Sequence, residues 1–386
     1  GLLHQSLDLT IGSMSVVIAG ARRRSTGDYA RVYDTIIGPP PYAGQRETWI
    51  VARISDFDNG DALDRRPSAG STAVAAAQRI TAALRQNGVR ARVATSTDIV
   101  EFERRVGSSA LAADRRLWGS IRGEQGFLTT YAYRSRDTAS EVLEQVWSMP
   151  ADAVIQNITV FPDRTLSATV TIRTPQPLPS PPSTVMRPLP GRQGAAMANN
   201  LCAPLQPIRG LERGPAPDVL TMPVGPSGVL LGKVGAGDRL MLPLGDPGDF
   251  TRVHIAADDH LSKRIIIRAA AAGDQITIHS RDLQRWGSVR MSQIVVGDQA
   301  RPASSTTVSV VDGSVSAAPR PNTVISVGPA DATSRPPADV VISQTGAATI
   351  EVATADEVFQ AEVELFRAEN RYLSTEPTEV GPEEPE

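Results

Sequence analysis

A helical pattern flanked by two strand-like runs restricts the first part of this chain to an α/β fold. ETWIVARI, Glu47 to Ile54, joins β-branched and aromatic residues in a short apolar run, which predicts a strand. From Ser71, STAVAAAQRITAALRQNG spaces its apolar residues as in a helix and ends at Asn87-Gly88, a common C-terminal stop. VRARVAT, which follows, alternates like a strand. Strand, helix and strand in this order predict a βαβ unit with a parallel pair of strands.

Further elements complete a first α/β domain that we expect over residues 1–173. Thr97-Asp98 can cap a helix that runs to Arg105, and GFLTTYAYR, which ends at Arg134, predicts another strand. The last part of this domain favours one helix and then an antiparallel hairpin around the turn FPDRT. These elements are expected at Thr138 to Trp147, Ala153 to Val160 and Leu166 to Ile172.

Proline sets residues 174–218 apart from the rest of the chain. TPQPLPSPPSTVMRPLPGRQG supplies proline often enough to block helices and interior strands, which predicts a linker or a long loop. The alternative is a proline-rich ligand for a recognition domain.

A second α/β region, richer in strands, is expected over residues 219–300. MPVGPSGVLLGKVGAGDRLMLPL predicts short strands joined by glycine and proline turns. HLSKRIIIRAAAAG, His260 to Gly273, predicts a helix, and QITIHS after it predicts a strand. RDLQRWG and VRMSQIVVG indicate one more helix and one more strand.

Residues 301–353 predict less regular structure. Three short β-like runs lie near Val308, Val324 and Val340, and they are separated by serine, proline and asparagine. We expect edge strands there, or partial disorder.

Residues 354–386 are expected to hold one helix and a tail. The helix should run from Asp356 to Asn370, and the end of the chain, STEPTEVGPEEPE, is acidic and too poor in apolar residues to form a core. Taken together, the elements predict a mixed α+β protein of the α/β class, with a βαβ unit in its first domain.

Charge and cysteine content narrow the class of partner. The formal net charge is -3, from 39 basic and 42 acidic residues, so no bulk field attracts the chain to nucleic acid or lipid headgroups, and we expect protein partners. Cys202 is the only cysteine, which excludes an intramolecular disulfide and fits a reducing compartment.

No apolar run reaches the roughly 18 residues that a membrane-spanning helix needs. Because the chain begins Gly-Leu-Leu without Met or a leader pattern, we expect it to start inside a longer protein.

Two aspartates form the strongest enzyme-like motif in the sequence. Asp56 and Asp58, in SDFDNGD, give an Asp-x-Asp after a predicted strand, a pattern that binds divalent metal in enzymes acting on sugar nucleotides. Asn59-Gly60 alone also explains the segment as a turn. The turn is the favoured interpretation, because Asp-x-Asp occurs by chance in acidic loops.

The glycine-rich stretch from Gly225 to Gly237 resembles a phosphate-binding loop only superficially. Fewer residues separate Gly228 from Gly232-Lys233 than a P-loop requires, and Val234 stands where Ser or Thr would hold magnesium. Turn formation is the favoured interpretation.

The histidines and one basic run are weaker candidates. The chain has four histidines, of which the last three could meet near the second helix, but His254 and His260 do not have a common metal-ligand spacing. Surface or partly buried histidines are the favoured alternative. Arg22-Arg23-Arg24 would attract anionic lipid if it lay near a membrane, although the flanking glycines favour a solvated loop. The histidines are His4, His254, His260 and His279.

Three stretches, in order and spacing, resemble the EccE family of actinobacterial type VII (ESX) secretion systems. They are RETWIVARI at 46–54, MPVGPSGVLLG at 222–232 and IIIRAAAAGDQITI at 265–278, and DYARVYDTI before the first of them is similar too. The resemblance covers roughly residues 1–297, and the region after Arg301 does not match the family. These are packing motifs, so we transfer no catalytic, cofactor-binding or metal-binding residue from the family.

The resemblance implies a structural role in protein export. EccE proteins are anchored by two N-terminal membrane helices, which we expect upstream of this chain, and carry an α/β domain in the cytoplasm. They assemble with EccB, EccC and EccD in the inner membrane, where EccC is the ATPase and EccE stabilises the complex. A non-catalytic subunit is therefore expected, with no cofactor and no nucleic-acid partner. Two alternatives stay open: a glycosyltransferase-like or nucleotide-binding enzyme using Asp56 and Asp58, and a lipid-binding module using Arg22 to Arg24.

Overall fold

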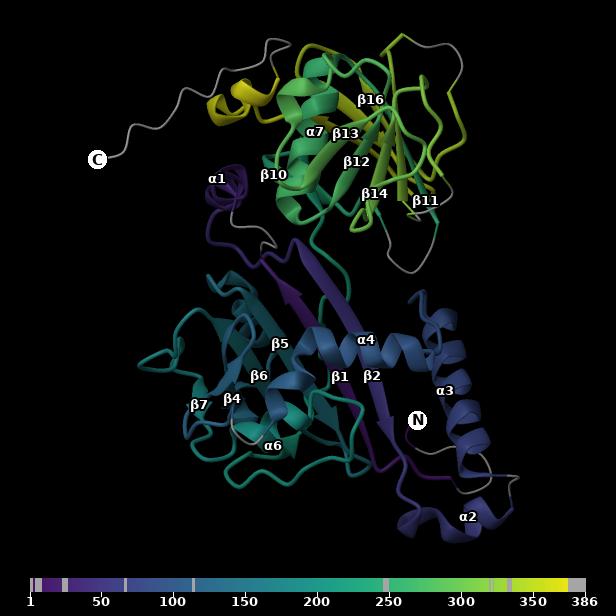
Figure 1. Cartoon of the computed structure of the whole chain (residues 1–386). Helices are drawn as coiled ribbons and strands as arrows, with labels where there is room; N and C mark the ends of the chain where they lie inside the picture. The colour runs from purple at the N-terminus through teal and green to yellow at the C-terminus, as the bar shows by residue number, and fades with distance from the viewer. Residues whose placement is uncertain are drawn as a thin grey trace. The chain divides into compact units, whose positions relative to one another are not determined.

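The computed structural model describes residues 3, 9–22, 27–65, 68–112, 115–245, 250–318, 321, 323–331 and 335–373. The chain divides into two compact units: unit 1 comprises Gly1–Ala21 and Arg46–Gly225, and unit 2 comprises Arg22–Gln45 and Pro226–Glu386. Each unit contains a sheet with helices packed on it, which confirms the mixed α/β class (Figure 1). The boundaries of the five segments expected from the sequence stay predictions.

Unit 1 is built on a sheet whose described pairings are antiparallel. Its strands are β1 (Ser13–Ala21), β2 (Gln45–Arg53), β3 (Ile121–Gly123), β4 (Gly126–Tyr133), β5 (Ala153–Val160), β6 (Thr165–Thr174), β7 (Met186–Pro188) and β8 (Gly214–Pro215). Their order is β2-β1-β5-β6-β4-β3, with β7 beside β4 and β8 beside β6. The hairpin of β5 and β6 pairs in one register from Ala153 with Arg173 to Val160 with Leu166, as the sequence predicts.

The predicted parallel βαβ unit is wrong. The strand β2 and a helix over Ala69–Gln86 form, but VRARVAT, residues 89–95, forms no strand. Local side-chain contacts hold this segment instead: Arg92 donates to Asp98 at 2.6 Å, and Arg85 donates to the backbone carbonyl of Ala91. The two strands that precede the helix are antiparallel, because the start of β1 is bonded to the end of β2, through the amide of Gly12 and the carbonyl of Arg53.

In unit 1, the helices α4 and α6 pack on this sheet, whereas α2 and α3 share a separate cluster of Leu9, Ala62 and Ala76. α4 lies across β1 and β2 (Figure 1), where Phe102 stacks on Trp49 with ring centroids 4.4 Å apart. The predicted helix is confirmed there, but its N-cap is Thr95, in a capping box with Asp98. The helix expected from 138 to 147 is shorter, because α5 passes into a 3-10 helix at Gln145. The helices are α2 (Gly60–Asp64), α3 (Ala69–Gln86), α4 (Ser96–Val106), α5 (Ser140–Glu144) and α6 (Gln193–Ala198).

The proline-rich segment 174–218 carries β7, α6 and β8, and side chains from it are buried in unit 1. Gln193 accepts from the amide of Thr130 on β4 at 2.7 Å and donates to its carbonyl at 3.0 Å. Asn200 donates to Thr171 on β6 at 2.9 Å. The prolines interrupt regular structure, as expected, while the residues between them cover the sheet.

Unit 2 is built on a larger sheet with a parallel run of strands. Its strands are β9 (Val229–Val234), β10 (Asp238–Leu242), β11 (Thr251–Ala256), β12 (Ile276–His279), β13 (Ile294–Gly297), β14 (Val308–Val311), β15 (Thr323–Gly328), β16 (Val340–Gln344), β17 (Thr349–Ala353) and β18 (Val358–Glu362). The order is β10-β9-β18-β17-β16-β11-β15-β14-β12-β13, and the run from β16 to β13 is parallel. The runs near 308, 324 and 340 are therefore interior strands, each paired on both sides, and the edge-strand expectation is wrong.

The helix α7 (Asp259–Ala272) lies on this sheet (Figure 1). Every residue from Leu261 to Ala272 is buried, because α1 (Asp28–Ile37) and the 3-10 helix η7 (Arg367–Tyr372) also pack on α7. Such a helix must bury its own charged side chains together with its apolar ones. Among the described residues, none of the helices has the length and apolarity needed to cross a bilayer.

Two helix predictions for unit 2 are wrong. The one expected from Asp356 to Asn370 is replaced by β18 and η7, because pairing of β18 with β17 satisfies the backbone and buries Ala361. RDLQRWG forms turns and then the 3-10 helix Gly287–Val289. The acidic tail, residues 374–386, lies outside the described residues.

Candidate functional site

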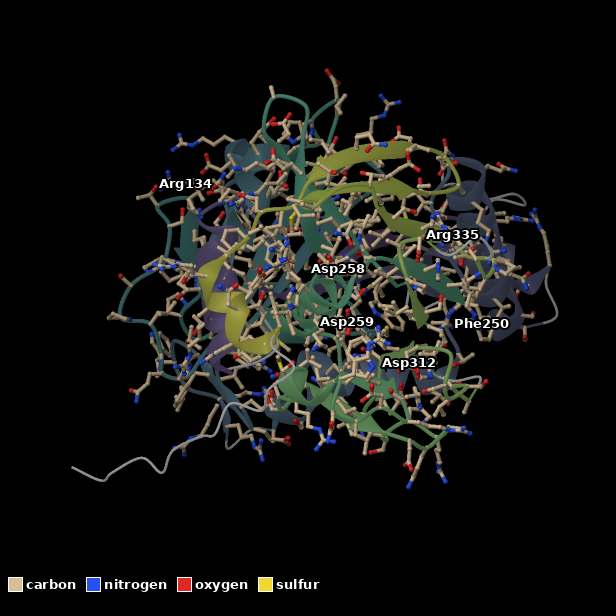
Figure 2. All side chains as sticks on the ribbon, turned by 90° about the horizontal axis from the view of Figure 1, so that it is seen from above. Arg134, Phe250, Asp258, Asp259, Asp312 and Arg335 are labelled. Carbon is tan, nitrogen blue, oxygen red and sulfur yellow. The ribbon has the colours of Figure 1, made fainter. Side chains whose placement is uncertain are left out.

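Ligands of α/β sheets usually bind beyond the carboxyl ends of the parallel strands. In unit 2, polar side chains follow four of these strands: Asp258 after β11, Ser280 after β12, Asp312 after β14 and Gln344 at the end of β16. Figure 2 looks onto this edge, with Asp258, Asp259 and Asp312 labelled. We call these residues, together with Asp282, Arg285 and Trp286, the carboxyl edge.

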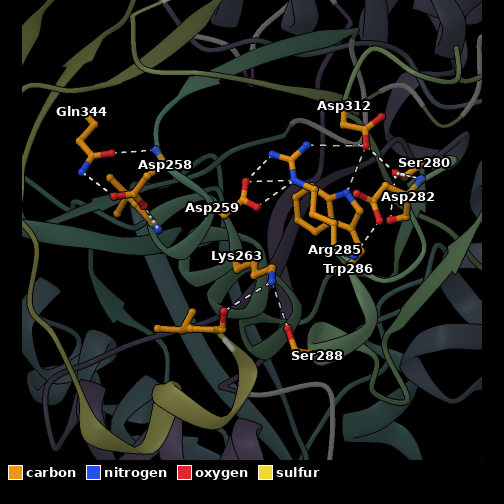
Figure 3. Close-up of polar contacts among 12 residues, drawn as sticks. Asp258, Asp259, Lys263, Ser280, Asp282, Arg285, Trp286, Ser288, Asp312 and Gln344 are labelled. Carbon is orange, nitrogen blue, oxygen red and sulfur yellow. Dashed lines mark hydrogen bonds and ion pairs between the residues drawn. The ribbon is translucent and has the colours of Figure 1, made fainter. Parts of the chain in front are cut away.

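The N-terminus of α7, the natural anion site of such an edge, is occupied by the chain itself. The carboxylate of Asp258 accepts from the amide of Leu261 at 2.8 Å and from the Gln344 side chain at 3.0 Å (Figure 3). Burial raises the pKa of Asp258, but these hydrogen bonds outweigh it, so the pKa lies below its usual value. An ionised carboxylate at neutral pH therefore complements the helix dipole.

Arg285 occupies the middle of the carboxyl edge (Figure 3). Its guanidinium contacts the carboxylate of Asp259 at 2.5 Å and that of Asp312 at 3.8 Å, and it lies 5.0 Å from the ring centroid of Trp286. Asp312 also accepts from the Ser280 hydroxyl at 2.5 Å. Burial raises the pKa of Asp312, but hydrogen bonds from Ser280 and Ser314 reverse this, and the pKa is lowered. The arrangement gives a closed polar network, in which each of these charges is already paired.

A second charged cluster is buried on the side of α7 that faces α1 and η7. Glu369 has no exposed surface, and its carboxylate accepts from Arg264 at 2.6 Å, from Arg268 at 2.7 Å and from the hydroxyl of Tyr29 at 2.8 Å. We call these four residues the Glu369 cluster. It joins three segments far apart in the sequence, and it was missed at the sequence level. The signal was present in KRIIIR, where cations interrupt an otherwise apolar helix.

Burial shifts the pKa of two groups in and beside this cluster. It raises the pKa of Tyr29, and the neighbouring Glu369 carboxylate adds to the effect. It lowers the pKa of Lys263, whose ammonium donates to Ser288 at 3.3 Å and to the backbone carbonyl of Leu373 at 3.4 Å (Figure 3). These contacts fasten the end of the described chain to α7.

The two aspartates of the enzyme-like motif lie on an exposed turn. Asp56 and Asp58 flank Phe57 at a 3-10 turn after β2, and all three side chains are exposed. Asn59 fixes the turn, because its side chain accepts from the amide of Thr10 at 2.7 Å and donates to the Thr10 carbonyl at 2.9 Å. Within the described residues, no group of three or more His, Cys, Asp or Glu side chains could hold a metal ion.

The glycine-rich stretch forms turns, as the favoured interpretation predicts. Gly228, Gly235 and Gly237 have positive φ, and the last two lie in the turn between β9 and β10. An open hollow of about 440 Å³ lies beside this turn, lined in part by Lys233 and Glu362. It has no helix N-terminus beside it in the described chain, which distinguishes it from a phosphate cradle.

The three described histidines lie on three different elements, and those on β11 and β12 are not brought together. His254 on β11 and His279 on β12 are separated by two strands, β15 and β14, and His260 lies on α7. His254 bonds to Ser326 at 2.9 Å, and His279 bonds to Ser309 at 3.1 Å. His4 lies outside the described residues.

Arg22 is a structural residue of unit 2, which corrects both the solvated-loop and the lipid-binding interpretations for this position. It is 7% exposed, and its guanidinium donates to Asp34 at 2.6 Å and to the backbone carbonyl of Pro40 at 2.8 Å. The ion pair with Asp34 holds α1 in position. Arg23 and Arg24 lie outside the described residues.

Comparison with known proteins connects this architecture to one family. The model described as "Putative type VII ESX secretion system translocon, EccE" matches residues 42–133. The chain is 47% identical to the ESX-2 secretion system protein EccE2 of Mycobacterium tuberculosis, over 97% of this chain and 74% of that protein. It is 30% identical to the ESX-1 secretion system protein EccE1 of Mycolicibacterium smegmatis, over 68% of this chain and 52% of that protein. The ESX-2 match extends past Arg301, into a region that the sequence alone had left unmatched.

Proposed function

The chain belongs to the EccE family of ESX type VII secretion systems, and on this premise we propose that it is a non-catalytic structural component of the secretion membrane complex. In this role it stabilises the assembly of EccB, EccC and EccD for protein export. We place it at the inner membrane, held by helices upstream of this chain, with the described units on the cytoplasmic side. A net charge of -3 gives no reason to expect a nucleic-acid partner.

The observation that supports a structural role is the closed network at the carboxyl edge. Arg285 is paired with Asp259 and Asp312, and Asp258 caps α7. A catalytic site needs groups that are available to the substrate, whereas these groups are bonded to one another or to the N-terminus of α7. We therefore assign no catalytic, cofactor-binding or metal-binding role to the residues of the carboxyl edge.

The experiment uses the full-length protein in a host strain that lacks its own copy. The tagged protein and the double variant Asp56→Ala/Asp58→Ala are expressed, and complex assembly on native gels and export into the medium are measured together. We expect both to be unchanged in the double variant. The matched control, Asp61→Ala/Asp64→Ala, removes two exposed carboxylates from the neighbouring helix α2.

An enzymatic role would give a different pattern. Export would fail in the Asp56/Asp58 variant while the complex stayed intact, and the control would export normally. That result would revive the glycosyltransferase-like or nucleotide-binding alternative and would contradict the structural proposal.

A further inference from the structure

A loop of unit 1 exposes two adjacent apolar side chains. Trp118 is 77% exposed and Leu117 is 49% exposed. In the part of the chain that the structure describes, no other two exposed large apolar residues are consecutive. An indole beside a leucine on a water-facing turn marks a contact surface, because both would gain from leaving water.

The loop holds these side chains in a fixed position. The amide of Leu117 donates to the carbonyl of Ser120 at 2.9 Å, and Arg116 and Ile121 form an antiparallel bridge. The carbonyl of Trp118 accepts from the amide of Gly191 at 2.6 Å. We call residues 115–122 the Trp118 loop.

Gly191 is required beneath the indole. A Cβ at this position would lie 2.7 Å from the six-membered ring of Trp118, and the residue has φ +69°. The ring therefore lies against the glycine backbone, and its orientation is set before any partner arrives. A preorganised aromatic side chain loses little conformational entropy on binding.

Arginines surround the exposed pair. Residues 115–124, RRLWGSIRGE, contain three arginines and a single carboxylate, Glu124, and Arg192 follows Gly191. Arg116, Arg122 and Arg192 are exposed, and Arg116 also donates to the carbonyl of Leu111 at 2.6 Å. Arg115 is half-buried and lies 4.0 Å from the carboxylate of Glu124. The loop is thus locally cationic in a chain whose net charge is -3.

We propose that the Trp118 loop contacts the surface of an anionic bilayer. Tryptophan favours the boundary between headgroups and acyl chains, and arginines placed just behind it meet the headgroup phosphates. An exposed ring that lies on the surface of a turn can enter such a boundary without a matching pocket, whereas a protein partner must supply one. The idea rests on the proposed place of the chain in a membrane complex, where a weak contact suffices to orient an already anchored protein.

The test measures sedimentation of the purified 386-residue chain with vesicles. Vesicles of phosphatidylcholine alone are compared with vesicles containing about 30% phosphatidylglycerol, a composition that gives an anionic surface. We expect binding to the anionic vesicles that weakens with salt. Trp118→Ser should reduce it about fivefold or more, and Arg122→Glu should reduce it about fivefold or more because it reverses a charge near the surface.

Two exposed residues of unit 1 provide matched controls. Phe57→Ser removes an apolar side chain that is 97% exposed, and Arg136→Glu reverses a charge that is 73% exposed. Neither should change binding. Quenching of tryptophan emission by brominated lipid should be present in the wild type and fall strongly in Trp118→Ser, since Trp147 and Trp286 are buried and the half-buried Trp49 stacks on Phe102.

The proposal is overturned if the wild type does not bind anionic vesicles, if Trp118→Ser binds normally, or if the controls lose binding equally. A protein contact is the other outcome that would overturn the proposal. In that case the wild type would not bind vesicles, and Trp118→Ser would release a protein subunit from the complex in the host experiment. The vesicle assay contains no other subunit. A failure of the proposed structural role would appear only in the host experiment and is therefore distinguishable.

Discussion

Neutralising Glu369 should destabilise unit 2 strongly. Its carboxylate is fully buried and accepts hydrogen bonds from Arg264, Arg268 and Tyr29 at 2.6 to 2.8 Å. Glu369→Gln keeps the shape of the side chain but leaves two guanidinium groups buried without their counter-charge. Removing one partner of a buried ion pair costs about 3–5 kcal/mol, because the remaining charge keeps its desolvation penalty and loses its attraction.

Amide hydrogen exchange of α7, followed by mass spectrometry, measures this loss directly. It reports the opening free energy of one helix, so it stays interpretable if the two units unfold separately. A loss of about 3 kcal/mol makes exchange roughly 100-fold faster. The control is Glu362→Gln, an exposed carboxylate on β18, which should change the free energy by less than about 0.5 kcal/mol. Equal protection of α7 in Glu369→Gln and in the control would refute the reasoning.

Three further substitutions test other parts of the account. Gly44→Ala places a Cβ 2.1 Å from the carbonyl oxygen of Ala272 at the end of α7, so it should lower the free energy of unfolding by about 1–3 kcal/mol or more, measured by thermal unfolding. Gly287→Ala has open space around the new Cβ and should lower it by about 1 kcal/mol or less. Burial raises the pKa of Tyr29 above its unfolded value of 10.0, so the stability that this group contributes is complete below pH 10 and is lost as pH rises further. The denaturation midpoint of the wild type should therefore fall above pH 10, and Tyr29→Phe should make this fall shallower. Thr95→Ala should lower the free energy of unfolding by about 1 kcal/mol through loss of the α4 capping box, and Thr97→Ala should not.

Elements with a strong local signal were predictable from the sequence. The helix that ends before Asn87-Gly88 and the hairpin around FPDRT form as expected, because periodicity and turn residues are local properties. The βαβ prediction failed because VRARVAT is held by Arg92 and Asp98 near the helix caps, a contact that alternation alone does not reveal. The segment around Val358 carries both helical and strand signals, and pairing with β17 decides for the strand.

The functional residues were less predictable than the fold. The carboxyl edge depends on which strands end beside each other, and the order of β16, β11, β15, β14 and β12 cannot be derived from local patterns. The Glu369 cluster joins residues more than 100 positions apart, and its acid lies in a stretch that was expected to be a helix. Arg22 appeared to be part of a solvated basic run, although Asp34 on α1 pairs with it.

The family itself was recognisable because its motifs are core segments. RETWIVARI contributes most of β2, and IIIRAAAAGDQITI spans the end of α7 and most of β12, so these stretches are fixed by packing. Packing motifs identify a scaffold and leave its binding surface unmarked. The Trp118 loop illustrates this, since its exposed tip forms no part of the motifs that carry the resemblance.

The central claim is that this EccE-family chain stabilises a secretion complex without catalysis, and co-purification of the tagged full-length protein from its host in mild detergent tests it most directly. The account predicts that EccB, EccC and EccD are recovered together with the wild type and equally with Asp56→Ala/Asp58→Ala. Recovery of the protein without these subunits, combined with a thermal shift on adding a nucleotide sugar or a divalent metal that the double variant abolishes, would contradict it.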